Sequence, residues 1–220
     1  MVRKMKVLVF GGLGFIGANF VNWCSVNRPE WSLKIADGFT YAADQNRLSR
    51  TLDIEIKKAR LENPENYLDL VKWADYVVNF AAETHNDNSL RDPRPFLESN
   101  VNGVFELLKL CTAHQAILIH ISTDEVYGDF PLDSTEMADE GHPFRPSSPY
   151  SSTKAAGDLL VMAWVRSFNL NAIVTHCTNN FGPGQHEEKL IPTIVKSIKT
   201  GAPIKLYGNG ANIRDWIHVD

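Results

Sequence analysis

Residues 6–17 read KVLVFGGLGFIG, and this stretch decides the fold. Lys6–Phe10 is a short β-branched, apolar run that is typical of a buried strand. Gly11, Gly14 and Gly17 follow at three-residue spacing, and a helical pattern runs over 15–26. Glycines between a strand and a helix permit a tight turn and let backbone amides approach a pyrophosphate. The stretch predicts a dinucleotide-binding unit, and a purely structural turn is the alternative.

Strand and helix patterns alternate along the rest of the chain. Apolar strand patterns recur at 33–36, 54–59, 76–81, 116–122 and 172–177, and helical patterns at 65–71, 95–114 and 150–168. Apolar strands separated by helices form a parallel sheet that is covered by helices on both faces. The predicted fold class is therefore α/β, with a Rossmann-type doubly wound parallel sheet.

The composition is that of an ordinary globular protein. Of the 220 residues, 44% are hydrophobic and 22% are charged, which excludes a disordered or fibrous chain. The net charge of −4 argues against nucleic acid as a partner. No run approaches the ~18 apolar residues that a membrane span needs. The three cysteines have no paired spacing, so we expect free thiols, no metal site and a cytoplasmic location.

An acidic residue, Asp37, stands at the end of the second predicted strand. A carboxylate in this position accepts hydrogen bonds from an adenosine ribose and repels a 2′-phosphate. No arginine follows it directly, so the sequence favours NAD over NADP as the cofactor. The alternative is that Asp37 only caps a turn with Gly38.

The fifth predicted strand ends in STDEVYG (122–128), which places two acids, Asp124 and Glu125, side by side. Two carboxylates that leave a buried strand are unfavourable unless they are solvated or functional. Where the backbone turns, both can face one cleft and act as an acid and a base. A solvated loop end is the alternative for this pair.

Tyr150 and Lys154 form a Y-x-x-x-K pattern at the start of a predicted helix. The four-residue spacing puts both side chains on one helix face, where the ammonium can lower the pKa of the phenol. Such a tyrosine can take a proton from an alcohol as hydride leaves. The pattern occurs often by chance, but it gains weight beside the glycine loop and Asp37.

Taken together, the motifs resemble the extended short-chain dehydrogenase/reductase family that acts on nucleotide sugars, and within it the 4,6-dehydratases. The resemblance rests on GGLGFIG (11–17), DGFTYA (37–42), FAAETHNDNS (80–89), STDEVYG (122–128), PYSSTK (149–154), NNFGPGQHEEKLIP (179–192) and LYGNGANIRDW (206–216). These segments span almost the whole chain in the family's order. The Thr-Asp-Glu triplet is the most specific element, because relatives that eliminate no water usually lack it.

The resemblance implies conversion of dTDP-glucose, or a similar NDP-glucose, to a 4-keto-6-deoxy sugar with loss of water and with NAD recycled in each turnover. Tyr150 would be the base at the oxygen on carbon 4, Thr123 would hold that oxygen, and Lys154 would bind the nicotinamide ribose. Glu125 would remove the carbon-5 proton, and Asp124 would protonate the leaving hydroxyl on carbon 6. The family's usual homodimer implies pairing through helices 95–114 and 150–168.

Further contacts follow from the same resemblance. Those implied for the cofactor are Gly11, Gly14, Phe15, Ile16, Gly17, Asp37, Phe39, Thr40, Leu61, Phe80, Ala81, Ala82, Thr84, Ser99, Tyr150, Lys154 and Asn180. Those implied for the substrate are Thr84, Thr123, Asn179, Lys189, Leu190, Lys205, Tyr207 and Arg214. Lys189 and Arg214 suit a pyrophosphate, although exposed charges on a solvated face are the alternative.

Residues 1–178 are expected to form the NAD-binding Rossmann domain. A proline-rich loop at 129–149 precedes the last helix of this part, and long loops at strand ends often carry ligand contacts. Residues 179–220 are expected to begin a substrate-binding region that is apparently truncated, because the chain stops within a strand pattern.

The sequence also departs from the family's pattern. Arg60 stands where an acid usually meets the adenine, Phe10 replaces a threonine, and Asn86 and Asn88 replace an apolar and a basic residue. Two rival hypotheses therefore stay open. One is an NAD-dependent epimerase or decarboxylase on the same scaffold, which the Asp124–Glu125 pair disfavours. The other is a non-catalytic NAD-binding homologue.

Overall fold

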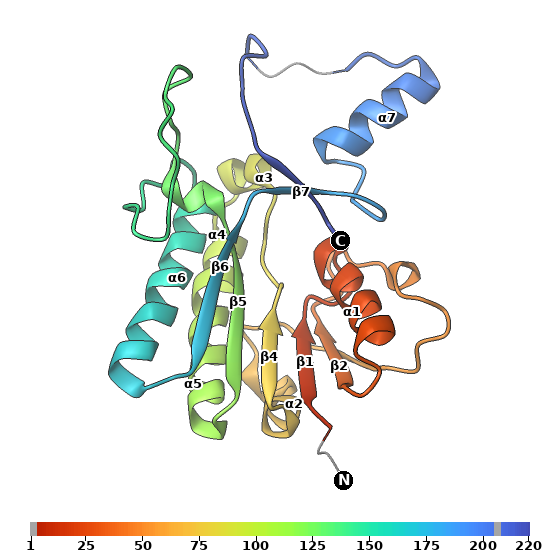
Figure 1. Ribbon diagram of the computed structural model, residues 1–220, viewed down its shortest axis with the longest axis vertical. Coiled ribbons are helices and arrows are strands. Elements are labelled where there is room, and N and C mark those ends of the chain that lie inside the picture. The colour runs from red at the N-terminus through yellow and green to blue at the C-terminus, as the bar shows by residue number, and fades with distance from the viewer. Residues whose placement is uncertain (1–3, 205–207) are drawn as a thin grey trace.

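A computed structural model describes residues 4–204 and 208–220, and its centre is a parallel six-stranded sheet (Figure 1). The strands are β1 (Lys6–Phe10), β2 (Ser32–Asp37), β3 (Glu55–Lys58), β4 (Tyr76–Asn79), β5 (Ile117–Thr123) and β6 (Ala172–Cys177). Their order is β3-β2-β1-β4-β5-β6, so successive strands are added on one side of β1 up to β3 and on its other side from β4 onward. This order confirms the predicted Rossmann-type sheet. In such folds ligands bind at the carboxyl ends of the two strands where the order changes, here β1 and β4.

The helices are α1 (Phe15–Asn27), α2 (Leu68–Trp73), α3 (Asn86–Arg91), α4 (Arg94–Leu97), α5 (Val104–His114), α6 (Pro149–Phe168) and α7 (Leu190–Thr200). Short helical turns are η1 (Gln45–Arg47), η2 (Pro64–Asn66), η3 (Glu98–Gly103) and η4 (Asp124–Tyr127). None of the helices in the described ranges is both long and apolar enough to span a membrane.

The prediction of one continuous helix over 95–114 is wrong in detail. The segment is divided into α4, a π-helical turn η3 and α5. The apolar spacing continues through all three, so a pattern of hydrophobic residues cannot reveal the extra residue in the π turn. Helix α3 and turn η4 were not predicted, because each is too short to show a period of its own.

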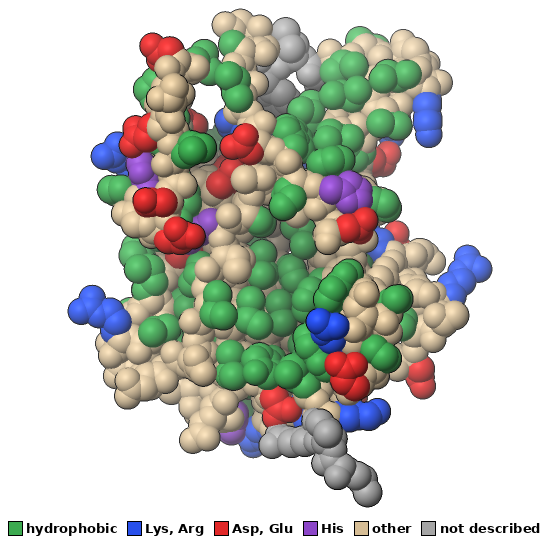
Figure 2. Space-filling model, viewed as in Figure 1, with side chains coloured by type: hydrophobic (Ala, Val, Ile, Leu, Met, Phe, Trp, Pro, Cys, Tyr) green, Lys and Arg blue, Asp and Glu red, His purple; other side chains and the backbone are tan. Residues whose placement is uncertain are grey.

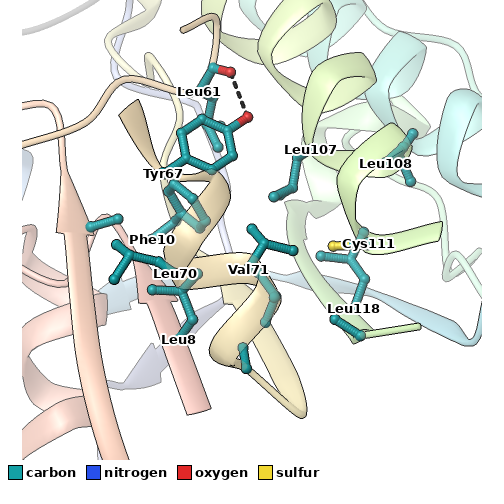
Figure 3. Close-up of a cluster of buried hydrophobic side chains, with 14 of the residues drawn as sticks. Leu8, Phe10, Leu61, Tyr67, Leu70, Val71, Leu107, Leu108, Cys111 and Leu118 are labelled. Atoms are coloured by element: carbon teal, nitrogen blue, oxygen red, sulfur yellow. Dashed lines mark hydrogen bonds between the residues drawn. The ribbon is translucent and has the colours of Figure 1, made fainter. Parts of the chain in front are cut away.

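One face of the sheet packs against α2, α5 and α6 and carries the larger hydrophobic core (Figure 3). Tyr67 lies at its centre, with its ring centroid 4.8 Å from that of Phe10 in an edge-to-face arrangement. Its hydroxyl donates a hydrogen bond of 2.8 Å to the Leu61 carbonyl. A buried phenol needs such a partner, because an unpaired buried polar group costs about 1–3 kcal/mol.

The other face is covered less completely. Val7, Val9 and Ile35 pack there against Val21 of α1. Toward β6, Ile173 remains 57% exposed. Figure 2 shows hydrophobic side chains gathered over the middle of this face, between α6 and α1. Helices therefore lie on both faces as predicted, but along β5 and β6 only one face is covered by helices of the described residues.

The segment after β6 forms a separate two-stranded parallel sheet and one helix. In it, β7 (Asn179–Phe181) pairs with β8 (Trp216–His218), so that Asn179 lies opposite Trp216. Helix α7 lies between these strands in the sequence. The residues of β7 continue directly from the end of β6, which brings this small sheet to the carboxyl edge of the large one (Figure 1).

Candidate active site

A cavity of about 400 Å³ lies at the carboxyl edge of the sheet. Most of the residues that the sequence pointed to line it: Gly11, Gly14, Phe15, Ile16, Gly17, Asp37, Thr40, Leu61, Phe80, Ala81, Ala82, Thr84, Ser99, Thr123, Glu125, Tyr150, Lys154, Asn179, Asn180, Lys189 and Leu190. The fold therefore brings residues that are far apart in the sequence to one hollow.

Five of the predicted residues are not placed in this lining. Phe39, Asp124 and Arg214 are described by the structure but are not part of the cavity wall. Phe39 has a φ of 51° and is exposed. The other two, Lys205 and Tyr207, lie outside the described residues.

The backbone around the glycine loop is packed too closely for any side chain at Gly11 or Gly17. Gly11 has a φ of +71°, and a Cβ added to it would lie 2.7 Å from the Ala81 amide nitrogen. A Cβ on Gly17 would lie 2.3 Å from the Gly11 carbonyl oxygen. Helix α1 begins directly after Gly14, so its first amides point into the cavity edge without intrahelical partners. The loop fits the pyrophosphate of a dinucleotide.

Asp37 holds the glycine loop to the end of β2. Its carboxylate accepts hydrogen bonds from the Leu13 amide at 3.0 Å and from the Phe39 amide at 2.8 Å. The turn-capping alternative is thus part of its role. The side chain also lines the cavity at 5% exposure, and a carboxylate has about four acceptor sites, so it can still accept from a ribose.

Arg60, the departure from the family's pattern, lies in the cavity wall. Its Nε donates to the Glu62 Oε1 at 2.5 Å, and Glu62 lines the same cavity. Its aliphatic stem lies close to Gly38, at the end of β2. Position 60 therefore carries a cation where the family's pattern has an acid. The carboxylate in this part of the wall is that of Glu62, which pairs with Arg60.

The turn after β5 positions the acidic pair. The Thr123 hydroxyl caps η4 by accepting from the Glu125 amide at 3.3 Å, and it donates to the Asp124 carboxylate at 3.2 Å. Because the backbone turns here, Glu125 faces the cavity while Asp124 lies beside it. The solvated-loop alternative does not fit, since neither acid is exposed.

The surroundings of the two acids raise the pKa of both. Burial raises the pKa of Asp124, and the Thr123 hydrogen bond and Arg214 oppose this shift. Burial and the neighbouring Asp124 raise the pKa of Glu125, and Arg214 and Lys189 oppose that shift. Arg214 therefore lies near the acidic pair, although it is outside the cavity lining.

Tyr150 is 8% exposed and lines the cavity in the first turn of α6. The helix start is fixed by a capping box, in which Ser148 and Ser151 exchange side-chain and backbone hydrogen bonds. Burial and then the Glu125 carboxylate raise the pKa of Tyr150, whereas a hydrogen bond with Thr123 lowers it. The lowering effect of Lys154 on this tyrosine stays a prediction.

Sequence reasoning missed Asn100, which fixes the segment after β4. Its side chain accepts from the Glu83 amide at 2.9 Å and donates to the Glu83 carbonyl at 3.0 Å. It also donates to the Thr153 hydroxyl at 3.1 Å. Asn100 lies in the π turn η3, and nothing in a single sequence distinguishes such a buried asparagine from a surface one.

Arg47 was missed as well. Its guanidinium donates to the carbonyls of Leu13 at 2.9 Å, Ala42 at 2.6 Å and Gly184 at 2.7 Å. It thereby connects the glycine loop to the segment that follows β7. On the other side of the cavity mouth, Lys189 donates to the Thr84 carbonyl at 3.4 Å.

These groups combine a phosphate-binding loop, a buried tyrosine–lysine pair and a partly buried acidic pair around one cavity. A family model described as "NAD dependent epimerase/dehydratase family" matches residues 7–220. The chain belongs to this family. The resemblance inferred from the motifs is thereby confirmed.

Individual members of the epimerase/dehydratase family narrow the comparison. The chain is 50% identical over 217 residues to the dTDP-glucose 4,6-dehydratase of Mycolicibacterium smegmatis, and the match covers 98% of this chain and 66% of that protein. It is 48% identical over 217 residues to the dTDP-glucose 4,6-dehydratase of Mycobacterium tuberculosis, with the same two coverages of 98% and 66%. This member therefore spans 66% of the length of both relatives.

Solved structures of the family agree. The dTDP-glucose 4,6-dehydratase DesIV from Streptomyces venezuelae, solved with NAD and TYD bound, superposes with a TM-score of 0.92 at 35% identity. The superposition covers 98% of this chain and 68% of that one. A UDP-glucose 4-epimerase of Thermus thermophilus, in complex with NAD, superposes with a TM-score of 0.87 at 25% identity. Among these, the dehydratases are more similar in sequence than the epimerase.

Proposed function

We propose that this protein is a nucleotide-sugar 4,6-dehydratase that acts on dTDP-glucose, or a similar NDP-glucose, in cytoplasmic deoxysugar biosynthesis. The observation that carries the proposal is the partly buried acidic pair at the end of β5, whose Glu125 lines the same cavity as Tyr150 and the glycine loop. An epimerase or a decarboxylase eliminates no water and has no use for two such acids. The two mycobacterial relatives are dTDP-glucose 4,6-dehydratases, which supports the same choice.

The cofactor of the proposed reaction is NAD. The amides at the start of α1 would hold its pyrophosphate, Asp37 its adenosine ribose, and Lys154 its nicotinamide ribose. When bound, NAD would supply hydride transfer, accepting the hydride of carbon 4 and donating it to carbon 6. The remaining steps are proton transfers, which the side chains of this chain carry out.

The proposed mechanism uses three side chains in order. Tyr150 takes the proton of the carbon-4 hydroxyl, with Thr123 holding that oxygen. The resulting ketone acidifies the carbon-5 hydrogen, which Glu125 removes as the base. Asp124 then protonates the hydroxyl on carbon 6, which leaves as water while a double bond forms between carbons 5 and 6. Glu125 returns a proton to carbon 5 when hydride is added to carbon 6.

The surroundings of the acidic pair suit this division of labour. Burial raises the pKa of Asp124, which favours the protonated form that an acid needs. The pKa of Glu125 is raised as well, by burial and by Asp124, while Arg214 and Lys189 oppose this shift. Because the two neighbouring carboxylates repel each other, a state with one acid protonated and the other ionised is favoured, as the proposed roles of Asp124 and Glu125 require.

The substrate would enter at the side formed by 179–220, which we propose is the beginning of the substrate-binding region. Lys189 lines the cavity, and Arg214 lies near the acidic pair, so both cations can meet a diphosphate. Thr84, Asn179 and Leu190 line the same side. Lys205 and Tyr207 complete the proposed substrate contacts from the segment outside the described residues.

Product analysis tests the proposed function. The protein is incubated with dTDP-glucose, and in parallel with UDP-glucose, and the sugar product is identified by mass and NMR. A 4-keto-6-deoxy product is expected, with dTDP-glucose the better substrate. A 4-epimer as the product would show an epimerase, and NAD binding without any product would show a non-catalytic homologue.

Replacing Asp37 with alanine should weaken NAD binding by about 10- to 100-fold and reduce discrimination against NADP. The estimate follows from hydrogen bonds to a charged group, which are worth about 1.5–3 kcal/mol each. Asp37→Asn is the matched control, because it keeps the shape but not the charge. Binding titrations with both dinucleotides measure the effect. Equal affinity of the unaltered protein for NAD and NADP would contradict the assignment.

A homodimer is expected to form through α5 and α6. The outward face of α6 leaves Leu159, Met162 and Phe168 half-exposed or more, which is more apolar surface than a monomer needs. Leu159→Glu combined with Met162→Glu should therefore produce a monomer. Light scattering at micromolar concentration measures the mass, and a monomeric unaltered protein would refute the expected dimer.

A further inference from the structure

Helix α6 carries a third ionisable residue on the face that holds Tyr150 and Lys154. Asp158 follows Lys154 by one helical turn, as Lys154 follows Tyr150, so the three side chains share one face. The Asp158 side chain is fully buried at 0% exposure. The proposed reaction does not use it, and a buried carboxylate needs partners.

Two side chains donate hydrogen bonds to Asp158. The Ser122 hydroxyl donates to Oδ2 at 2.7 Å from the end of β5. The Nε2 of His176, in β6, lies 3.1 Å from the same oxygen and faces an acceptor, so it carries the hydrogen. The Nδ1 of His176 then accepts from the Tyr127 hydroxyl at 3.0 Å.

A third side chain, His120, faces Asp158 with a nitrogen that carries a hydrogen. The Ala81 amide donates to the Asn79 side-chain oxygen at 3.1 Å, so the Asn79 amide group must be the donor toward Nδ1 of His120, 3.1 Å away. The hydrogen of the neutral His120 ring is then on Nε2. That nitrogen lies 3.6 Å from Oδ1 of Asp158, which is too long for a hydrogen bond. Within the described ranges both of these buried atoms are without a hydrogen-bond partner.

Lys154 lies one helical turn before Asp158 on the same face of α6. Its ammonium is buried and donates to the Ile121 carbonyl at 2.8 Å, one residue before Ser122. A buried ammonium is stable only with a compensating negative charge nearby. Burial lowers the pKa of Lys154, and the Asp158 carboxylate is the main group that opposes this shift.

The other ionisable groups around Lys154 are poorer counter-ions. On its own helix Tyr150 is a neutral phenol, because burial raises its pKa. On β5, the pKa of buried His120 is lowered, and His176 on β6 is already bonded to Asp158, so neither histidine supplies negative charge. Burial raises the pKa of the Cys177 thiol, so it stays neutral. Glu125 faces the cavity and Asp124 lies beside it, and neither affects the pKa of Lys154 as Asp158 does.

We infer that Asp158 is a positioning residue, the buried counter-ion that keeps Lys154 protonated beside Tyr150. Ser122 and His176 hold the carboxylate by hydrogen bonds, and the Nε2 of His120 faces its other oxygen, so its position is fixed. The hydrogen-bond arrangement is a matter of geometry, and the negative charge of Asp158 is part of the inference. Only the consequence for turnover rests on the proposed function.

The titration of Lys154 tests this inference without any turnover. The Nζ signal of Lys154 is followed by NMR in protein with isotope-labelled lysine and assigned by its loss in Lys154→Met. In Asp158→Asn, Lys154 should lose its proton at lower pH than in the unaltered protein, and Asp158→Glu should restore most of the difference. Asp69→Asn, which removes an exposed carboxylate paired with Lys57 on the surface, is the matched control and should change nothing.

The pH profile of turnover gives a second measurement. A neutral Lys154 no longer favours the Tyr150 phenolate, so the acid limb of the profile should move to higher pH in Asp158→Asn. The rate at neutral pH should fall by about tenfold, as a one-unit shift of that limb gives, and recover at alkaline pH. A purely structural role would instead lower the rate equally at every pH.

Two results would overturn the inference. One is an identical Lys154 titration in the unaltered protein and in folded Asp158→Asn. The other is a Lys154 that is already neutral at pH near 7 in the unaltered protein, which needs no variant to fold. If the unaltered protein made no 4-keto product, the proposed function would fail while the lysine titration still decided the role of Asp158.

Discussion

Tyr150→Phe is expected to lower the rate of NADH formation by ~10²–10⁴, the usual loss when a positioned general base is removed. Without the phenol oxygen, the carbon-4 alcohol keeps its proton and the first oxidation cannot proceed. Tyr150 is buried at the cavity wall, where a replacement by water is hindered. Stopped-flow absorbance on mixing protein, NAD and dTDP-glucose measures the rate directly.

The matched control is Tyr76→Phe. Tyr76 begins β4 at the end of the strand remote from the cavity, and the substitution removes the same single hydroxyl. Its NADH formation should equal that of the unaltered protein. NAD binding and thermal unfolding of Tyr150→Phe should also stay near normal, since the ring remains in place. An active Tyr150→Phe would remove this residue from the redox step.

Glu125→Gln is expected to separate dehydration from oxidation. If Glu125 only removes the carbon-5 proton, NADH should still form when the variant meets the substrate. Exchange of the carbon-5 hydrogen with solvent deuterium should fall by ~10²–10⁴, and the 4-keto-6-deoxy product should disappear with it. NMR of the recovered sugar in deuterated water measures the exchange.

Glu125 should set the low-pH limit of carbon-5 exchange, the step that follows oxidation, whereas Tyr150 sets the acid limb of the whole turnover. Burial and the adjacent Asp124 raise the pKa of Glu125 above its ordinary value. A base must be deprotonated, so the rate should fall as the pH drops through this raised pKa. This fall in the carbon-5 exchange rate should therefore occur at higher pH than an exposed glutamate would give. The residual exchange in Glu125→Gln should not show it.

Glu106→Gln is the control for the loss of a carboxylate. Glu106 lies on α5 and pairs at the surface with Lys109. It should leave both NADH formation and carbon-5 exchange unchanged. If Glu125→Gln blocked NADH formation as fully as Tyr150→Phe while still binding NAD, the proposed division of roles would be wrong. The acidic pair would then act in binding or in the redox step.

Local sequence determined the sheet and the phosphate-binding loop. β-branched runs and glycine spacing depend on backbone sterics over a few residues, so Lys6–Phe10 and the loop after it are readable from the chain alone. The Tyr150–Lys154 spacing likewise specifies one helix face without any knowledge of the fold. These motifs were sufficient for the family and for most of the cavity lining.

Tertiary structure alone decided which residues hold these motifs in place. Asn100, Arg47 and Asp158 act through partners that are distant in sequence: Glu83, Gly184 and Ser122. No spacing rule predicts such pairs, because their distance depends on how whole elements pack. The π turn η3 escaped for a related reason, since its extra residue leaves the hydrophobic period almost unchanged.

The pKa shifts of the ionisable groups also depend on the tertiary structure. The sequence showed that Asp124, Glu125 and Lys154 exist, but their pKa directions follow from burial and from Arg214, Lys189 and Asp158, which only the fold brings near. Asp37 makes the same point from its hydrogen bonds, because its carboxylate both caps a turn and faces the cavity. The chain thus specifies its chemistry locally, and the environment that tunes this chemistry arises only from long-range packing.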